Sequence, residues 1–557
     1  MAMRMPLACL GSGLFLASAA LHGSAQIAAH YRPGDEAAWV IEQGDKRFGH
    51  CASRYEGEVE LGGLRAHHFR DQAELELEAP GGKLRQRYTV ERWLDDAGHP
   101  LRFELRAQIG DAKSSVEGAF ASGKAELVVR QGATDKPVSV GGVKDVFLLA
   151  NNFVAHLELA LRLLPDEEKR TVTFFSGNAL TTFPLTLKRG GQSAAGGSVI
   201  DDSLGERLEL SPERKLVRVE IASQKLAFRR VDEPIERFTI ELPRRTTAED
   251  IAREDVKIVD GDVSLAGTLT RKQGAQGRLP AVTFLSGSGP QDRDGYSSGI
   301  DLGTHEILDR LTREGFLVLR VDDRGVGAST GPTKDIDFGD LVEDGRRAVR
   351  FLLARPDVDP KRVVLIGHSE GGLSAPVLAA DEPLAAIVLM AAPGRPLEDL
   401  LREQFLFAKH QAGASAEECE RFESELDLFL EAIAKGEEID KEGTPAELAA
   451  FVPARAWLLS HLGRDPLSFV KKVRCPILIL QGGKDVQVSA ERDSPKLVAA
   501  LDEAKHPDHE LKLFPTLDHL FKKAGDPPSE LDYLKTRPVD PEFLDALVAW
   551  LRARLMK

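Results

Sequence analysis

The sequence predicts a chain of two folded parts, a β-rich N-terminal region followed by an α/β domain built on a mostly parallel sheet. Two observations predict this organisation. Between about residues 27 and 242, apolar and polar residues alternate with a period of two, as in strands with one buried and one exposed face. After residue 255, short apolar runs without alternation are separated by helical segments, which is typical of parallel strands buried on both faces.

The first 25 residues predict a secretory signal peptide, 1–25. Arg4 precedes a short apolar run, and "HGSAQ" offers a cleavage site after Ala25. An anchor that stays attached is the alternative, but the run is short for a membrane-spanning helix. No stable membrane insertion is expected after cleavage. Of the four cysteines, Cys9 leaves with the signal and the others form no disulfide framework, which favours a bacterial periplasm or the cell exterior.

The composition argues against some classes of partner. The formal net charge is −15 and Lys and Arg form no long blocks, so nucleic acid is not an expected partner. No cysteine or histidine spacing is typical of a metal site. His67 and His68 are adjacent but lack further ligands, and we interpret them as surface residues. No metal is therefore expected, and the oligomeric state is left open.

The N-terminal domain, predicted over residues 26–242, combines strands with one long helix. Alternation predicts strands at 73–79, 84–93, 101–109, 215–221 and 237–242. Five apolar residues instead have helical spacing, Phe147, Ala150, Phe153, Leu157 and Leu161. They predict a helix over 145–165 that ends at proline. We expect a sheet curled against this helix, and a polar linker over 243–255.

The α/β domain, predicted over residues 256–557, alternates strands and helices. Apolar runs predict strands within 281–289, 316–325, 362–369, 385–393, 476–485 and 510–519. The closing helix, 541–555, is expected to start with Asp540 as its N-cap and Pro541 at its first position. Between about 396 and 470 the pattern becomes helical, which predicts a helical lid inserted between two strands.

The segment "LIGHSEGG" predicts a nucleophile elbow at Ser369. A serine hydroxyl is a weak nucleophile until a base takes its proton, and a tight turn must hold it clear of its neighbours. Gly367 and Gly371 are the small residues two before and two after it, and His368 and Glu370 flank it directly. The motif follows a buried strand and precedes a helix, which is the context that G-x-S-x-G requires.

The partners of Ser369 are expected later in the chain, first an acid and then a histidine. Asp485 ends one strand and His519 follows the last one, so both should lie at the carboxyl edge of the sheet. Asp518 is a rival acid, ranked lower because adjacent side chains diverge. Two rival histidines fall before or at the start of the last strand, His506 and His509.

Two backbone N–H donors should stabilise the oxyanion. One is expected at Glu370, and the other in the loop 286–295, at Ser288 with Gly287 as the next choice. Three charged residues should hold this loop by ion pairs: Asp292, Arg293 and Asp294. The carboxylate of Glu370 should point away from the oxyanion and pair with Arg324 or Arg293.

Five motifs occur in order, "SGSGPQDRDG", "DDRGVGASTG", "IGHSEGG", "GGKDVQV" and "DHLF". Together they resemble the α/β-hydrolase superfamily, most closely its bacterial carboxylesterase branch, which is grouped with serine-aminopeptidase-like hydrolases. The resemblance covers about residues 255–557 and implies an α/β-hydrolase fold with a triad of Ser369, Asp485 and His519. It also implies a supporting role for Asp323 and Arg324. Ser286 stands where many members have a histidine, a departure that leaves a backbone donor intact.

The favoured interpretation is an exported serine hydrolase that cleaves a small carboxylic ester through an acyl-enzyme, without metal or cofactor. A thioesterase or an aminopeptidase-like serine peptidase would use the same triad. A peptidase needs an acid for the free amino terminus, and three lid residues are candidates, Glu403, Glu418 and Glu425. A non-enzyme alternative is a lipid- or polysaccharide-binding protein, whose N-terminal domain should enclose a wide apolar cavity.

Overall fold

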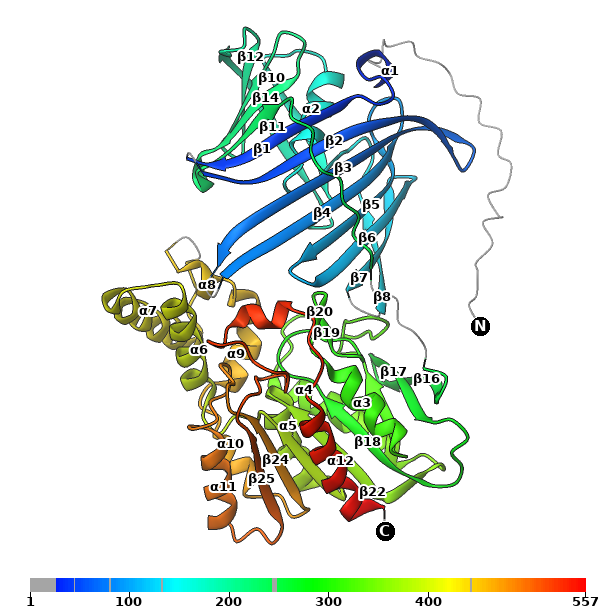
Figure 1. Cartoon of the computed structure of the whole chain (residues 1–557), viewed down its shortest axis with the longest axis vertical. Helices are drawn as coiled ribbons and strands as arrows, with labels where there is room; N and C mark the ends of the chain where they lie inside the picture. Colours follow the sequence, from blue (N-terminus) through cyan, green and yellow to red (C-terminus); the bar gives the residue numbers. More distant parts are fainter. Residues whose placement is uncertain are drawn as a thin grey trace.

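A computed structural model describes residues 27–44, 46–79, 82–131, 134–242, 248–440 and 443–556. The predicted signal peptide, 1–25, lies outside the described residues. Within these ranges, no helix is long and apolar enough to cross a membrane. A β-rich domain and an α/β domain are stacked along the long axis of the molecule (Figure 1).

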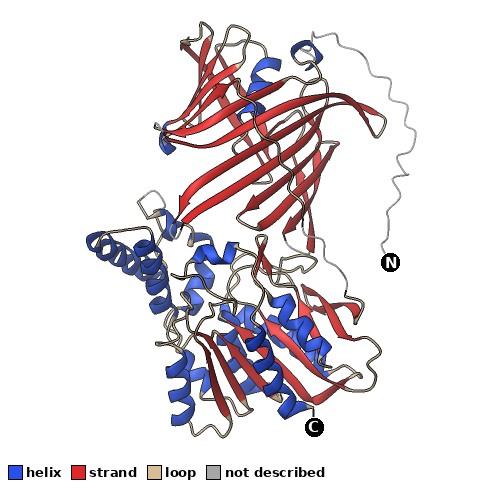
Figure 2. Cartoon of the chain, in the orientation of Figure 1, coloured by secondary structure: helices blue, strands red, loops and turns tan. Residues whose placement is uncertain are grey.

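The N-terminal domain is one sheet of fifteen strands that curls around a helix (Figure 2). Its order is β8-β7-β6-β5-β4-β3-β2-β1-β15-β14-β13-β12-β11-β10-β9, so neighbours in the sequence pair and β1 joins β15. The pair β9–β10 is parallel. The strands are β1 (Glu36–Gln43), β2 (Lys46–Leu61), β3 (Leu64–Ala79), β4 (Gly82–Leu94), β5 (Pro100–Ile109), β6 (Ala112–Ala121), β7 (Lys124–Gln131), β8 (Thr134–Gly141), β9 (Phe147–Leu149), β10 (Lys169–Ser176), β11 (Thr181–Gln192), β12 (Ser198–Asp202), β13 (Glu206–Leu210), β14 (Leu216–Ile221) and β15 (Leu226–Val231). A short helix, α1 (Ile27–His30), precedes them.

The helix inside the curl, α2 (Val154–Leu163), is shorter than predicted. Nine of its ten residues are buried. The prediction of helix from residue 145 is wrong because residues 147–149 form β9, and Asn152 then turns the chain with a φ of 70°. The spacing of Phe147 and Phe153 reflects burial of a strand and a turn rather than one continuous helix. The buried side chains of α2 belong to one apolar cluster with those of the surrounding strands, which is the packed core expected of a structural module.

The strand predicted at 237–242 is also absent from the sheet. Residues 234–242 form an extended segment without strand pairing, although Ile240 is buried. Side chains hold this segment against the sheet, since Gln72 donates to the carbonyl of Glu236 and Arg106 donates to that of Ile240. The alternation therefore reflects a segment with one buried face. Hydrogen bonds from polar side chains hold this segment in place, where a strand would have backbone hydrogen bonds.

The surface interpretation is wrong for His67, whose side chain is fully buried. Its Nδ1 lies 2.8 Å from the hydroxyl of Tyr55 and its Nε2 lies 2.7 Å from a carboxylate oxygen of Asp96. His68 is 12% exposed and stacks on Trp93. These histidines take part in structural contacts of the sheet.

The α/β domain has an eight-stranded sheet in the order β16-β17-β21-β18-β22-β23-β24-β25. The pairs β16–β17 and β17–β21 are antiparallel, and the remaining pairs are parallel. The strands are β16 (Ile251–Asp260), β17 (Val263–Lys272), β18 (Leu279–Leu285), β21 (Leu317–Val321), β22 (Val358–His368), β23 (Ala386–Met390), β24 (Ile477–Gly482) and β25 (His509–Phe514). The predicted fold class is confirmed.

Helices cover both faces of this sheet. One apolar cluster joins the strands to α4 (Phe338–Leu353), α5 (Glu370–Asp381) and α11 (Ser494–Glu503). A second cluster joins them to α3 (Thr304–Arg313) and α12 (Pro541–Leu555). The predicted cap of α12 is confirmed, because the carboxylate of Asp540 accepts from the N–H groups of Glu542 and Phe543.

The start of the α/β domain and the extent of the lid can be compared with their predicted bounds. Strand β16 begins at Ile251, so the predicted linker, 243–255, extends too far; its polar residues belong to a hairpin with one exposed face. The connection from β23 to β24 carries the helices predicted as a lid. They are α6 (Leu397–Gln411), α7 (Ala416–Lys435), α8 (Ala446–Ala449), α9 (Arg455–His461) and α10 (Pro466–Val470). The lid has its own apolar cluster around Phe422 and Leu426.

Candidate active site

Ser369 lies on a sharp turn between β22 and α5. Its φ of 54° and ψ of −118° are a strained backbone conformation for a residue with a side chain. The flanking glycines make the turn possible: a Cβ on Gly367 would lie 2.1 Å from the carbonyl oxygen of Gly371, and a Cβ on Gly371 would lie 2.3 Å from that of Leu285. The sequence GHSEGG therefore forms the elbow that lifts a serine above the edge of the sheet.

The structure brings Asp485 and His519 together at this edge. Asp485 follows β24, His519 follows β25, and His519 Nδ1 lies 2.8 Å from Asp485 Oδ2. The other carboxylate oxygen of Asp485 accepts from the N–H groups of Gln487 and Val488 at 2.8 and 2.9 Å. The acid is thus fixed in a buried position where it can orient the imidazole.

The rival residues face elsewhere. Asp518 lies 2.7 Å from the guanidinium of Arg537 and also accepts from two N–H groups of its own turn. His509 begins β25 and pairs with Asp502, so it lies at the opposite end of that strand from His519. His506 precedes β25 and accepts from the N–H of Asp508.

His368 is a positioning residue that the motif alone did not reveal. Its Nε2 donates to the backbone carbonyl of His519 at 2.9 Å, and the two imidazole rings lie 4.7 Å apart. Burial lowers the pKa of His368 to about 3. It therefore stays neutral and ties the turn that carries His519 to the elbow.

The loop after β18 lies beside the elbow. A Cβ on Gly287 would approach the Cβ of Ser369 to 3.1 Å. Within the described part of the chain, no hydrogen bond uses the N–H groups of Gly287, Ser288 or Glu370. These are the amides predicted to form the oxyanion hole, and they remain available to a substrate.

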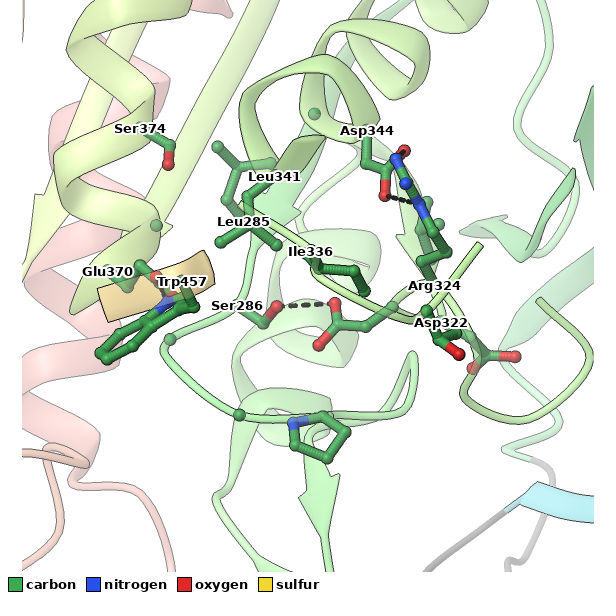
Figure 3. A pocket seen from close by; sticks show the side chains of 18 of the residues that line it. Leu285, Ser286, Asp322, Arg324, Ile336, Leu341, Asp344, Glu370, Ser374 and Trp457 are labelled. Atoms are coloured by element: carbon green, nitrogen blue, oxygen red, sulfur yellow. Dashed lines mark hydrogen bonds and ion pairs between the residues drawn. The ribbon is translucent and has the colours of Figure 1, made fainter. Parts of the chain in front are cut away.

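Asp323 supports this loop from below. It accepts from the hydroxyl of Ser286 at 2.7 Å, a contact drawn as the dashed line at Ser286 in Figure 3. It also accepts from the N–H of Gln291 at 2.9 Å. Gln291 in turn donates to the carbonyl of Gly287 at 3.1 Å. Burial raises the pKa of Asp323 to about 7, against these hydrogen bonds, which lower it. The sequence places Gln291 in this loop but does not predict its contact with Gly287.

Ion pairs hold the rest of the loop, as predicted for Arg293. Its guanidinium lies 2.6 Å from Asp322, and Asp294 lies 3.2 Å from the buried Arg320. Arg324 pairs with Asp344 of α4 at 2.8 Å (Figure 3). It also pairs with Asp340 of the same helix at 3.1 Å. Asp292 accepts from the N–H of Tyr296 and closes the turn.

The predicted partner of Glu370 is wrong. Arg293 and Arg324 are engaged with other carboxylates, and Glu370 instead reaches the lid. Its Oε1 accepts from the indole N–H of Trp457 and lies 2.9 Å from Nε2 of His461, both on α9. The side chain of Glu370 is only 12% exposed. The charge beside the serine thus joins the elbow to the lid, and no motif spacing predicts this contact between remote segments.

A cavity of about 310 Å³ opens above Ser369. Ser369, His519 and Ser288 line it, and the lid contributes an apolar wall that includes Leu397, Leu400, Leu401 and Phe451. Glu370 is its single carboxylate lining residue among the described residues. Glu403, Glu418 and Glu425 do not line it. Glu403 pairs with Arg395, and Glu418 completes the capping box of α7.

A second cavity, of about 330 Å³, lies behind the elbow (Figure 3). Apolar side chains such as Leu285, Ile336 and Leu341 line it, together with Ser286 and Asp323. Both cavities are lined by Gly287, Glu370 and Trp457. The contact between Glu370 and Trp457 therefore stands where the two cavities meet.

Comparison with known proteins finds several hydrolases among the relatives of this chain. A family model described as serine aminopeptidase, S33, matches residues 302–523, which include Ser369, Asp485 and His519. Esterase EstD of Thermotoga maritima is 30% identical over 311 residues, covering 56% of this chain and 70% of EstD. A thiohydrolase of Arthrinium phaeospermum is 34% identical over 140 residues, covering 25% of this chain and 42% of that protein. Among solved structures, an esterase of Pyrococcus furiosus is 20% identical, with 58% of this chain and 100% of that chain covered and a TM-score of 0.38.

Proposed function

Because the chain belongs to the α/β-hydrolase superfamily of esterases and serine-aminopeptidase-like hydrolases, we propose that it is a serine hydrolase that cleaves carboxylic esters through an acyl-enzyme. The observation that carries this proposal is the 2.8 Å contact between Asp485 and His519, which lines the same cavity as Ser369. Ser369, His519 and Asp485 are the proposed triad.

In the proposed reaction, the hydroxyl of Ser369 attacks the ester carbonyl while Nε2 of His519 takes its proton. Asp485 holds the Nδ1–H of the imidazole and stabilises its charged form. The N–H groups of Glu370 and Ser288 stabilise the oxyanion, with Gly287 as the next candidate. The proton passes from His519 to the departing alcohol, and water, activated by the same imidazole, then releases the acid.

An ester is favoured over a peptide by the lining of the cavity. A free amino terminus needs a buried carboxylate that is not already paired, since an ammonium group is costly to bury alone. The carboxylate that lines the cavity is Glu370, which is engaged by Trp457 and His461. The apolar wall from the lid suits an acyl or alkyl group instead. A thioester would fit the same groups.

Export remains a prediction from the first 25 residues, with a bacterial periplasm or the cell exterior as the proposed location. In that setting an acyl-coenzyme A thioester would be an unusual substrate, which is a further reason to favour an ester. Detection of the mature chain, beginning at Gln26, in a periplasmic fraction would support export. A chain that keeps residues 1–25 and stays in the cytosol would contradict it.

A panel of substrates tests the proposal. p-Nitrophenyl esters of rising chain length, aminoacyl anilides and an acyl thioester are compared, with Ser369→Ala as the control. We expect ester turnover to exceed anilide turnover and to be lost in Ser369→Ala. Anilide turnover well above ester turnover would overturn the esterase assignment, and full activity in Ser369→Ala would overturn the triad.

A further inference from the structure

Two small segments form part of the wall of the cavity above Ser369. One is the hairpin of β19 (Tyr296–Ser297) and β20 (Ile300–Asp301), from which Ser297 and Ile300 line the cavity. The other is the short helix η3 (Glu530–Leu534), which contributes Tyr533. Two-residue strands and a single helical turn are too short to hold their own conformation. Their position must come from the elements that pack against them.

The hydroxyl of Tyr533 is a buried polar group in this wall. It has no hydrogen-bond partner among the residues that the structure describes. A buried, unsatisfied hydroxyl is unfavourable in the empty site, and a substrate oxygen would satisfy it. Burial also raises the pKa of Tyr533 well above its usual value, so the hydroxyl is a donor across the working pH range.

The N-terminal domain contacts both segments through the turn between β5 and β6 (Figure 1). The N–H of Asp111 donates to the carbonyl of Leu534 at 2.7 Å. The carboxylate of Asp111 accepts from the N–H of Thr536 at 2.9 Å. The N–H of Lys113 donates to the carbonyl of Gly299, at the tip of the hairpin, at 3.3 Å. One turn therefore holds the residue after Tyr533 and the tip between Ser297 and Ile300.

Glycines on both sides allow this close approach. A Cβ on Gly110 would lie 2.8 Å from the carbonyl oxygen of Leu534, and a Cβ on Gly299 would lie 2.6 Å from that of Lys113. A further contact joins Lys136 of β8 to the carbonyl of Gly325 at 2.6 Å. Gly325 lies two residues after Asp323, which supports the loop 286–295 beside Ser369. The contacts of the N-terminal domain thus reach the loops at the carboxyl edge of the α/β sheet, where Ser369 lies.

We propose that Tyr533 is a substrate-binding residue that donates a hydrogen bond to an oxygen of the ester's acyl or alcohol arm, and that the β5–β6 turn, through Asp111, positions it. This inference rests on the proposed esterase function. It gives the N-terminal domain a role in substrate selection, separate from the chemistry of the triad.

Matched ester pairs test the role of Tyr533. The first pair is p-nitrophenyl methoxyacetate and p-nitrophenyl butyrate, which differ by an oxygen in place of a CH₂ on the acyl arm. The second pair is 2-methoxyethyl butyrate and butyl butyrate, which differ in the same way on the alcohol arm. Tyr533→Phe should lower the kcat/KM of the oxygen-containing member relative to its partner by about fivefold or more in at least one pair, as loss of a hydrogen bond predicts. Unchanged ratios in both pairs would overturn the substrate-binding role.

A pair of glycine variants tests the positioning role. Gly110→Ala introduces a Cβ against Leu534, whereas Gly62→Ala introduces one where no atom lies within 4 Å; their φ values, 59° and 58°, impose the same backbone strain. Hydrogen exchange of residues 296–301 and 529–536 should be faster in Gly110→Ala than in Gly62→Ala, and Asp111→Ala should behave like Gly110→Ala. Equal exchange in all three variants would overturn the positioning role. The exchange measurement needs no substrate, so it tests the positioning role even if the esterase function is wrong. The proposed esterase function fails if the unmodified chain hydrolyses none of the esters.

Discussion

Glu370→Gln should loosen the lid from the nucleophile elbow without disturbing the triad. The substitution keeps the shape of the side chain and removes its charge. Glu370 accepts from the indole of Trp457 and lies 2.9 Å from Nε2 of His461, and it is 12% exposed, so solvent screens these contacts weakly. It also occupies the first turn of α5, where a negative charge is favoured.

The magnitude follows from these contacts. A hydrogen bond to a charged group contributes about 1.5–3 kcal/mol and a neutral one about 0.5–1.5 kcal/mol, so losing the charge costs roughly 1–1.5 kcal/mol at Trp457. Loss of the charge at the N-terminus of α5 costs about 0.3–1 kcal/mol more, but it does this whether the lid is open or closed. The lid should therefore open more easily by about 1–1.5 kcal/mol, which corresponds to about 5- to 12-fold faster amide exchange in α9.

The assay is hydrogen exchange of residues 452–461, measured beside ester kinetics. Glu417→Gln is the matched control, because Glu417 is an exposed acid in the first turn of α7 and should show the helix effect alone. A double variant with Trp457→Phe should add little to Glu370→Gln, since both remove the same contact. If Glu370→Gln exchanges at the same rate as Glu417→Gln in the lid, the reasoning about this contact is wrong.

Three further predictions concern the elbow, the triad and its support. Gly367→Ala should lower kcat/KM by at least about 10²-fold, because its Cβ would lie 2.1 Å from the carbonyl oxygen of Gly371 and displace the serine; ester kinetics on folded protein would check this. Asp485→Asn should lower kcat by about 10³–10⁴-fold with KM little changed, because an amide can hold the imidazole in the wrong tautomer and does not stabilise its charged form; near-normal kcat would contradict the assignment. Asp323 has a folded pKa of about 7 against 3.8 for the free side chain, so the folded state binds the proton more tightly and stability should fall as the pH rises from about 4 to about 7. Asp323→Asn cannot ionise, so urea midpoints at pH 5 and pH 8 should differ less in this variant than in the unmodified chain.

Much of the α/β domain could be predicted because its signals are local. Apolar runs mark strands that are buried on both faces, and the motif order places Ser369, Asp485 and His519 at strand ends on one edge. The N-terminal domain is harder to predict, because the period of the apolar pattern and the burial of residues do not determine which strands pair in the sheet. Phe147 and Ile240 are both buried, yet one belongs to a short parallel strand and the other to an unpaired segment.

The contacts between remote segments could not be predicted from spacing. Glu370 and Trp457 are separated by 87 positions in the sequence, and Asp111 and Thr536 by 425. The pattern of strands does not determine how many residues are inserted between them as a lid, nor where the N-terminal domain lies. Neither contact can therefore be inferred from a motif. The wrong partner assigned to Glu370 has the same origin, because the nearby arginines were visible in the sequence while the lid's position was not.

The order of strands in the N-terminal sheet has a consequence for biosynthesis. Because each strand pairs mainly with its neighbour in the sequence, hairpins can form one after another as the chain is synthesised. This domain can therefore be complete before the residues around Tyr533 are synthesised. The last part of the hydrolase domain would then fold onto an existing surface, with the β5–β6 turn acting as a template for the substrate wall.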